Sequence, residues 1–488
     1  MRHFVCFFFL ALTCASAIPP PPAPLQEFRG VWVASVYNID WPSKAGLSST
    51  EQQAELLALL NTATKLRLNA ILLQVRPAGD ALYRSELEPW SPWLTGEMGK
   101  SPSPAYDPLE FAIREAHKRG LQLHAWFNPF RALSSADKYK VSPTHLSRRH
   151  PEWMRRYAGN LWMDPGIEGV RQHAIAVMSD VARRYDVDGI HIDDYFYPYP
   201  VKGQAFDDTK TYQSYLNNGG ALPLLDWRRQ NMNHFIRDLH LSLKQIKPNL
   251  SFGISPFGYW RPNVPETIRG ALDPYDSLAA DVRLWLHQGW LDYLVPQLYW
   301  PIQPPELSFT TLYHWWQSEN PLRKPIYAGI AVDRIGKDRD AKEILDQIAI
   351  TRAKPRLTPS GHVHWNWRAL SSNRDKVANR LLAETYLTHA LVPPNRPQSS
   401  TILVAPELTL QGRVLSWRTP PPASASQARF WFVQTYNGSR WLTHPPLPGS
   451  QTGIMLPKEA QAVSVQAVSA DNHVGPGKTQ DLKMQDTR

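Results

Sequence analysis

The chain has 488 residues, which exceeds one ordinary domain and predicts a large domain with a smaller one attached. Its formal net charge is +10, but Lys and Arg are scattered along the chain rather than massed in one segment, which argues against nucleic-acid binding. Its two cysteines, Cys6 and Cys14, both lie near the N-terminus. The stability of the folded part must therefore come from burial rather than from disulfides.

The N-terminal segment has the pattern of a secretory signal. A short basic start precedes an apolar run over 4–12, which is too short to anchor the chain permanently in a bilayer. Two processing routes stay open: cleavage after the A-x-A site at 15–17, or lipidation at Cys14, which follows threonine in an imperfect lipoprotein box. The sequence thus predicts a signal over 1–17, a proline-rich linker over 18–26 and an exported protein.

Eight β-like runs alternate with segments of helical period between residues 27 and 391. The runs lie at 28–35, 69–77, 121–129, 187–195, 251–258, 291–300, 325–333 and 362–370, and amphipathic segments include 51–67, 108–120, 168–185 and 228–247. This rhythm is typical of a parallel sheet, and eight units of this length predict a (β/α)₈ TIM barrel with enlarged loops. An open doubly wound sheet is the alternative, but it would usually show a Gly-rich phosphate loop after the first strand, and none is present.

After residue 391 the composition changes. Residues 392–400 have the composition of a linker, and 401–480 contain short β-like runs without helical period. About seven short strands in such a length predict a small β-sandwich of fibronectin type III kind, with a role in binding or spacing. Because few contacts should cross a proline-bearing boundary, we expect the barrel to fold without this sandwich.

Two adjacent acids follow the fourth run. Alternation along the strand places Ile190 and Ile192 on the outer face of the barrel, and His191 and Asp193 on the inner face. Active sites of TIM barrels lie where the strands end, and an acid on the inner face costs desolvation unless it is paired or used. Asp193 is therefore predicted to point into the barrel mouth, and Asp194 is either a second acid of the site or a structural cap.

Polar and aromatic side chains follow the other predicted strands in the same way. These residues are Arg76, Trp126, Asn128, Arg131, Asp164, Tyr195, Ser255, Trp260, Arg261, Gln297, Tyr299 and Trp300. Each alone is a weak signal, and Asp164 by itself would be an ordinary helix cap. Together the carboxylates, amides, arginines and aromatic rings predict a sugar cleft, with the aromatic stretch 195–199 as one wall.

Glycoside hydrolysis commonly needs two carboxyl groups, one to protonate the leaving oxygen and one to attack or to activate water. Asp193 is the predicted nucleophile or base. The candidates for its partner are Asp194, Asp281 and Asp80, in that order. No His pair or His/Asp cluster has the spacing of a metal site, so neither a metal nor a cofactor is expected.

Five motifs resemble a known family. They are EFRGVWVASVYNIDWPS, QVRPAGDALYRSELEPWSPWLTGEMG, YDPLEFAIREAHKRGLQLHAWFNPFR, DGIHIDDYFYPYP and LDYLVPQLYW. Together they resemble the glycosyl-hydrolase-like family ten of exported bacterial barrels, from Glu27 to Leu391. The resemblance implies a periplasmic hydrolase connected with cell division, which cleaves peptidoglycan glycan strands stripped of their peptides. If Cys14 is lipidated, the protein would associate with the outer membrane.

The resemblance carries over the pair Asp193 and Asp194, the strand-end residues named above apart from Tyr195, and also Asp281 and Arg283. Three departures limit it: Asp80 does not match the family's pattern, the eighth run lacks an acid that a relative carries there, and the C-terminal sandwich is an addition. A non-catalytic, glycan-binding scaffold of the envelope is the alternative function. Two carboxyls that converge at the barrel mouth would favour the enzyme.

Overall fold

The computed structural model describes residues 18–135, 140–353, 358–394, 402–421 and 428–482. The predicted signal with Cys14, and the part of the predicted linker from residue 395 to 400, lie outside these residues. Within the described ranges, no helix is long and apolar enough to cross a membrane.

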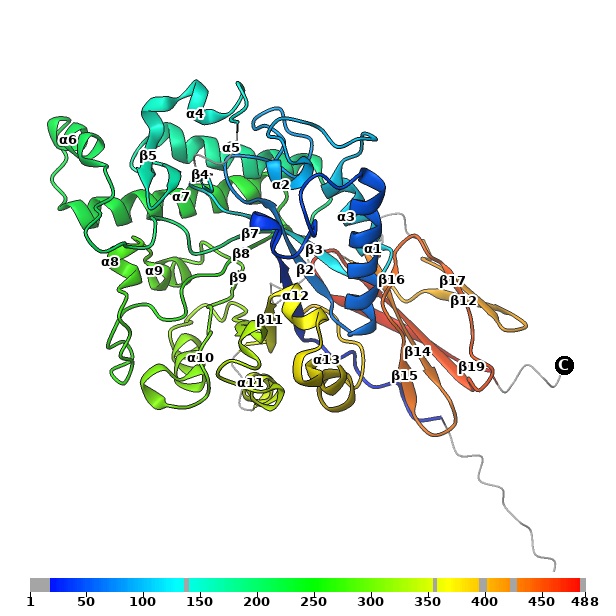
Figure 1. Cartoon of the computed structure of the whole chain (residues 1–488). Coiled ribbons are helices and arrows are strands. Elements are labelled where there is room, and N and C mark those ends of the chain that lie inside the picture. The colour runs from blue at the N-terminus through cyan, green and yellow to red at the C-terminus, as the bar shows by residue number, and fades with distance from the viewer. Residues whose placement is uncertain (1–17, 136–139, 354–357, 395–401, 422–427, 483–488) are drawn as a thin grey trace, which may run out of the picture.

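Eight parallel strands form one curled sheet at the centre of the molecule (Figure 1). In chain order they are β1 (Phe28–Val33), β2 (Ala70–Arg76), β3 (Gln122–Phe127), β7 (Gly189–Ile192), β8 (Ser251–Ile254), β9 (Tyr293–Leu294), β10 (Ala328–Ala331) and β11 (Gly361–Trp365). Strand β11 pairs with β1, and the bridges Leu294–Ile326 and Gln297–Gly329 join the β9 and β10 regions, which closes the circle. The predicted (β/α)₈ barrel is confirmed, and each predicted run overlaps one strand.

Helices surround the strands (Figure 1). The longer ones are α1 (Ser49–Lys65), α3 (Pro108–His117), α5 (Glu168–Arg184), α7 (Leu224–Ile246), α10 (Phe309–Ser318) and α11 (Ala341–Arg352), and shorter ones are α2 (Pro92–Thr95), α4 (Leu146–Arg149), α6 (Thr209–Asn217), α8 (Pro274–Ser277), α9 (Val282–His287), α12 (Trp367–Ser371) and α13 (Val377–Arg380). Capping residues in the sequence determine where the helices begin. Ser48 and Glu51 form a reciprocal capping box at α1, while Asp107 caps α3 just before Pro108.

The long connection between β3 and α5 carries a small antiparallel sheet. Its strands are β4 (Arg131–Leu133), β5 (Met154–Tyr157) and β6 (Asn160–Met163), in the order β4-β6-β5. The sheet begins only a few residues after β3 ends, so it lies beside the end of the barrel where the strands stop. This insertion is one of the enlarged loops that the sequence predicts.

The barrel strands separate two apolar layers. Ile190 and Ile192 belong to the large cluster between the strands and the helices. Inside the barrel, the rings of Phe28 and Tyr327 stack with their centroids 4.4 Å apart. His191 points inward, because its Nδ1 lies 3.1 Å from the Tyr293 hydroxyl. The predicted alternation along the fourth strand is thereby confirmed.

The C-terminal part is an all-antiparallel sandwich. Strands β12 (Glu407–Gln411), β13 (Val414–Arg418) and β17 (Gly453–Met455) form one sheet, and β14 (Phe430–Tyr436), β15 (Trp441–Thr443), β16 (Leu447–Pro448), β18 (Ala462–Val468) and β19 (Val474–Asp481) form the other. Trp417 of the first sheet contacts Trp431 of the second, with ring centroids 5.8 Å apart. The predicted C-terminal β-sandwich is confirmed.

The sandwich packs on the end of the barrel where the strands begin, beside α1 and α3 (Figure 1). Arg429 of the sandwich forms ion pairs with Asp186 and Asp188, which precede β7. The Gln122 amide donates to Asn472 at 2.5 Å. The expectation that few contacts cross this boundary is therefore wrong, because charged and polar side chains from both parts are buried against one another.

Candidate functional site

Asp193 and Asp194 follow β7 at the carboxyl end of the barrel strands, and both are buried. The Asp193 carboxylate accepts a hydrogen bond from Trp126 Nε1 at 3.0 Å and from Asn128 Nδ2 at 3.4 Å. The backbone N–H of Tyr195 donates to its other oxygen at 3.3 Å. Groups from the end of β3 and from its own loop thus fix the orientation of Asp193.

Asp194 contacts a different set of groups. Its carboxylate accepts from the Tyr199 hydroxyl and from the Gln297 side chain. Gln297 also donates from Nε2 to the backbone oxygen of Ser255 at 2.9 Å. The neighbouring acids are therefore held from opposite sides of the mouth, Asp193 by the β3 end and Asp194 by the segment after β9. Asp194 is part of the site rather than a helix cap.

The environment of the pair alters its proton affinity. Burial raises the pKa of Asp193 to about 7, and the charge of Asp194 adds to this shift, while Arg131 and the hydrogen-bond donors oppose it. Burial also raises the pKa of Asp194. Two interacting acids of this kind titrate as a pair. Near neutral pH the pair can hold one proton, which leaves one acid protonated and the other ionised.

Arg131 is the cation beside the pair. Its guanidinium lies 4.4 Å from the centroid of the Tyr195 ring, and its Nη1 donates to the Pro77 backbone oxygen at 3.4 Å. Its backbone N–H donates to Asn128 Oδ1 at 3.1 Å. Arg131 thus links the loop after β3 to the aromatic residue that follows the two acids.

Aromatic rings from several strands gather next to Asp193. Trp365, half-buried at the end of β11, contacts Trp126 and Trp32, with centroids 6.1 Å away in each case. It also stacks on Tyr299 at 6.4 Å. Trp32 and Trp365 were not among the predicted site residues. Trp32 is the last residue but one of β1 and Trp365 is the last residue of β11, but the predicted runs continued to residues 35 and 370 and so hid this place at the strand ends.

The predicted aromatic wall over 195–199 is only partly present. Tyr195 and Tyr199 contact each other at 5.4 Å. Phe196, in contrast, packs on Trp285, and both Phe196 and Tyr197 are almost fully buried. Those two rings support the loop and cannot stack on a sugar. The expectation for them was wrong because the loop folds back onto α9 rather than running along the mouth.

Ser255 and Trp300 lie on neighbouring strand ends. Ser255 Oγ is 3.0 Å from His191 Nε2, so this hydroxyl connects the barrel interior with the mouth. Trp300 stacks on Tyr259, with centroids 5.5 Å apart, and contacts Phe257. Within the segment after β9, Gln297 contacts Asp194 and Tyr299 stacks on Trp365, whereas the Trp300 ring packs on rings that follow β8.

Arg76 was predicted to contact substrate, but it is buried below the loop. It forms an ion pair with Glu88 at 2.5 Å, and only 1% of its surface is exposed. Its Nη1 donates to the backbone oxygens of Asn128 and Pro129. Arg76 thus positions the loop that carries Asn128. The partner Glu88 lies in the loop after β2, where the sequence offered no signal for it.

Asp164 is likewise a structural acid. It is fully buried and accepts hydrogen bonds from Arg155 at 2.7 Å and from Thr211 at 2.5 Å. The Gly166 N–H also donates to it at 2.9 Å. These contacts tie the small sheet to α6 and the turn before α5. The expectation that Asp164 binds substrate is corrected, because its oxygens are occupied within the protein.

The remaining predicted residues form a separate cluster around α8 and α9. Asp281 caps α9 by accepting from the Leu284 N–H at 3.2 Å, and Trp260 lies in the same cluster with the Arg283 guanidinium 5.4 Å from its ring centroid. The other members are Arg261, which pairs with Asp273 and Asp276, and Arg283, which pairs with Glu319. The structure therefore brings Asp194, rather than Asp281, into one site with Asp193.

Asp80 is likewise not placed to act as the partner acid of Asp193. It is buried, and burial raises its pKa to about 6. Its carboxylate accepts from the Ala78 N–H at 3.1 Å and from the Ser91 side chain, so it stabilises its own loop. Among the described residues, no group of three or more His, Cys, Asp or Glu side chains is placed to hold a metal ion.

Comparison with known proteins places this geometry in context. Residues 27–344 match the family model described as Glycosyl hydrolase-like 10. The chain is 39% identical over 396 residues to Glycosyl hydrolase YngK of Bacillus subtilis (strain 168), which covers 79% of this chain and 76% of that protein. It is 36% identical over 343 residues to Glycosyl hydrolase DigH of Escherichia coli (strain K12), with 65% and 76% covered.

Among solved structures, the PgaB (BpsB) glycoside hydrolase domain from Bordetella bronchiseptica matches with a TM-score of 0.46 and 14% identity, over 75% of this chain and 100% of that chain. A likeness at this level carries no argument for this chain. The family match, in contrast, extends from β1 into α11 and includes both acids of the pair.

Proposed function

The chain belongs to the Glycosyl hydrolase-like 10 family and is a glycosidase, and on that premise we propose that it cleaves the glycan strands of bacterial peptidoglycan with Asp193 and Asp194 as its catalytic pair. We propose further that its substrate is the peptide-free strand and that it works in the periplasm after export, held at the outer membrane if Cys14 is lipidated. A role in cell division belongs to the same proposal.

The observation that carries the mechanism is the pair of buried, adjacent carboxyls at the barrel mouth. The donors around Asp193, namely Trp126, Asn128 and the Tyr195 N–H, all favour its ionised form. We therefore assign Asp193, once ionised, as nucleophile or base and Asp194 as its partner acid. Burial makes two charges costly, so the pair favours holding a single proton.

Charge supports the choice of substrate. Removal of peptides from a peptidoglycan strand leaves a free carboxylate on every second sugar, so the strand is an anionic polymer. A protein with a net charge of +10 attracts such a polymer. The rings of Trp126, Tyr299 and Trp365 next to Asp193 offer apolar faces on which sugar rings can pack.

Cleavage of purified peptide-free glycan strands tests the proposal. The wild type should release shorter fragments, and Asp193→Asn should cut turnover by about 10²–10⁴-fold, the usual range for a positioned acid or base. Glycan binding should be retained, because the amide keeps the size of the side chain. Mass spectrometry of the fragments and a separate binding measurement provide the two readouts.

Asp281→Asn is the matched control for this experiment. It removes an acid from the same end of the barrel, and Asn is as good a helix cap as Asp, so turnover should stay close to that of the wild type. Near-normal cleavage by Asp193→Asn would exclude the mechanism. Glycan binding by the wild type without any cleavage would instead favour the scaffold function.

A further inference from the structure

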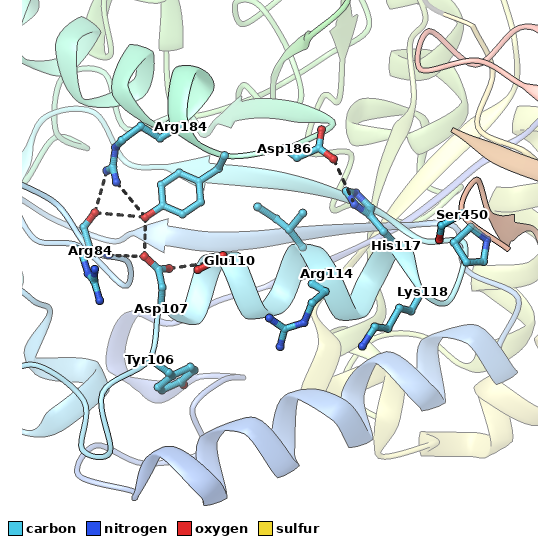
Figure 2. A pocket seen from close by; sticks show the side chains of 13 residues that line it. Arg84, Tyr106, Asp107, Glu110, Arg114, His117, Lys118, Arg184, Asp186 and Ser450 are labelled. Atoms are coloured by element: carbon cyan, nitrogen blue, oxygen red, sulfur yellow. Dashed lines mark hydrogen bonds and ion pairs between the residues drawn. The ribbon is translucent and has the colours of Figure 1, made fainter. Parts of the chain in front are cut away.

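A pocket of about 980 Å³ lies outside the barrel, between α3, the end of α5 and the loop after β16 (Figure 2). Its lining includes Tyr106 and Tyr185 from the barrel, and Pro448 and Ser450 from the sandwich. Ligand sites usually have volumes of about 300–1,000 Å³ and often lie where two domains meet. This pocket does not border Asp193, so the proposed chemistry leaves it unexplained.

The junction that frames the pocket is fixed by buried charge. Arg429 donates from Nη1 to Asp186 at 2.5 Å and from Nη2 to Asp188 at 2.9 Å. Burial alone would raise the pKa of Asp188, but His117 and Arg429 hold it well below its usual range. The Asp188 carboxylate is therefore ionised and paired, and it holds the sandwich against the start of β7.

Close backbone contact fixes the sandwich loop as well. Gly120 has φ +69°, and a Cβ at this position would lie 2.2 Å from the backbone oxygen of Pro446. A glycine is therefore required for this loop to reach the start of β3. Pro448 and Ser450, a few residues further on, line the pocket. The wall that the sandwich contributes is thus held in place by the barrel.

The pocket wall has an excess of positive charge. Two of its acids are already engaged, Asp107 by the Tyr185 hydroxyl at 2.6 Å and Asp186 by Arg429. Arg114 and Lys118 are 53% and 58% exposed. Both share one acid, Glu115, with Arg119, so three cations face a single carboxylate there.

Figure 2 shows Arg114 and Lys118 along α3 and Arg84 at the far end of the pocket. The Tyr106 ring lies beside the same helix. Glu110 and Asp186 are the exposed acids of the wall, Asp186 is paired with Arg429, and the three cations outnumber them. The described lining therefore combines exposed positive charge with an aromatic face.

We propose that this pocket is an accessory binding site for an anionic saccharide, in which carboxylates pair with Arg84, Arg114 and Lys118 and a sugar ring packs on Tyr106. The inference rests on the proposed function, because a peptide-free glycan strand carries such carboxylates. A long strand held here is tethered while another part of it occupies the barrel mouth. Binding at the pocket raises the effective concentration of the strand at the barrel mouth. Only strands long enough to reach both sites therefore bind more tightly.

Neutralising the two cations on α3 tests the site in the full chain. The variant Arg114→Gln/Lys118→Gln should bind peptide-free strands at least about tenfold more weakly and raise KM for them, with kcat unchanged. Cleavage of short oligosaccharides should be unaffected, because they reach only the mouth. Calorimetry and steady-state kinetics with long and short substrates give these readouts.

The matched control is Lys342→Gln/Arg380→Gln, which removes two surface cations that pair with acids on α11 and near α13. It should leave binding and kinetics close to those of the wild type. The loss in the pocket variant should shrink at high salt, because exposed charges are screened. An equal loss in both variants would show that net charge alone is responsible and would overturn the proposal.

Oligomers of N-acetylglucosamine, matched in length to the peptide-free strands but without carboxylates, complete the test. They should bind the wild type and the pocket variant equally. Unchanged binding of peptide-free strands by the pocket variant, or an equal loss for the uncharged oligomers, would overturn the inference. If neither the wild type nor any variant cleaves a glycan, the proposed function fails. The binding comparison still decides whether the pocket binds an anionic saccharide.

Discussion

At the scale of single residues, Asp193 shows how burial and hydrogen bonding oppose each other. Its donors stabilise the charged carboxylate, yet burial beside Asp194 raises its pKa to about 7. The alternation along the fourth run was sufficient to predict that Asp193 faces the mouth. It could not show that Arg76 is buried on Glu88, because that depends on how the loop after β2 folds.

The raised pKa of Asp193 predicts that this residue lowers the free energy of unfolding more at high pH than at low pH. An aspartate in an unfolded chain has a pKa of about 3.9, so between pH 4 and 7, roughly, the folded state binds more protons than the unfolded state. The wild type therefore loses stability as pH rises through this range. Because the pKa of Asp193 rises from about 3.9 to about 7, the loss in unfolding free energy is on the order of 4 kcal/mol at most.

Asp193→Asn removes this titration. The variant should gain stability relative to the wild type as pH rises from about 4 to 8, and most of the gain should be complete slightly above pH 7. Thermal unfolding of both proteins across the range measures the difference. A difference that stays constant with pH would contradict the prediction.

At the scale of strands, the barrel interior is filled by large rings set against glycines. A Cβ on Gly253 of β8 would lie 1.9 Å from Cζ of Tyr293, and one on Gly189 of β7 would lie 2.2 Å from His124 Nδ1. The Tyr293 hydroxyl in turn lies within hydrogen-bond distance of His124 and His191. Sequence periodicity revealed the strands because buried runs are short and apolar, but it could not show which rings meet which glycines.

Gly253→Ala should overpack this interior. The added methyl group displaces the Tyr293 ring, and overpacking of this kind typically costs about 1–3 kcal/mol. Replacing Tyr293 by Leu in the same protein makes room, so the double variant should be more stable than the sum of the two single effects predicts. Urea unfolding of the four proteins measures the coupling, and strictly additive effects would show that the contact is not limiting.

At the scale of the whole molecule, the sandwich and the barrel share buried charge. The linker composition predicts a change of fold after residue 391, but it could not show the contact between Arg429 and Asp188, which are 241 residues apart. Leu391 also packs in one cluster with Phe430 and Val468. A chain cut after the barrel would leave Asp188 with His117 and the Leu123 N–H but without the Arg429 cation, and it would expose this cluster, so we expect the isolated barrel to be less stable than the full chain.

Arg429→Met tests that coupling directly. Removing one partner of a buried ion pair leaves the other charge buried and unpaired, which usually costs about 3–5 kcal/mol. Because His117 remains next to Asp188, we expect a loss of about 3 kcal/mol in unfolding free energy, the lower end of that range. Arg418→Met is the control, because it removes a sandwich arginine whose pair with Glu407 is exposed, and such pairs contribute about 0–1 kcal/mol.

The pKa of Asp188 lies below its unfolded value, so the stabilisation by Arg429 is complete above pH 4, roughly, and declines only as pH falls below that. Calorimetry at neutral pH should therefore show a marked decrease in Tm for Arg429→Met alone. Equal Tm values for the two variants would mean that the sandwich does not stabilise the barrel through this contact.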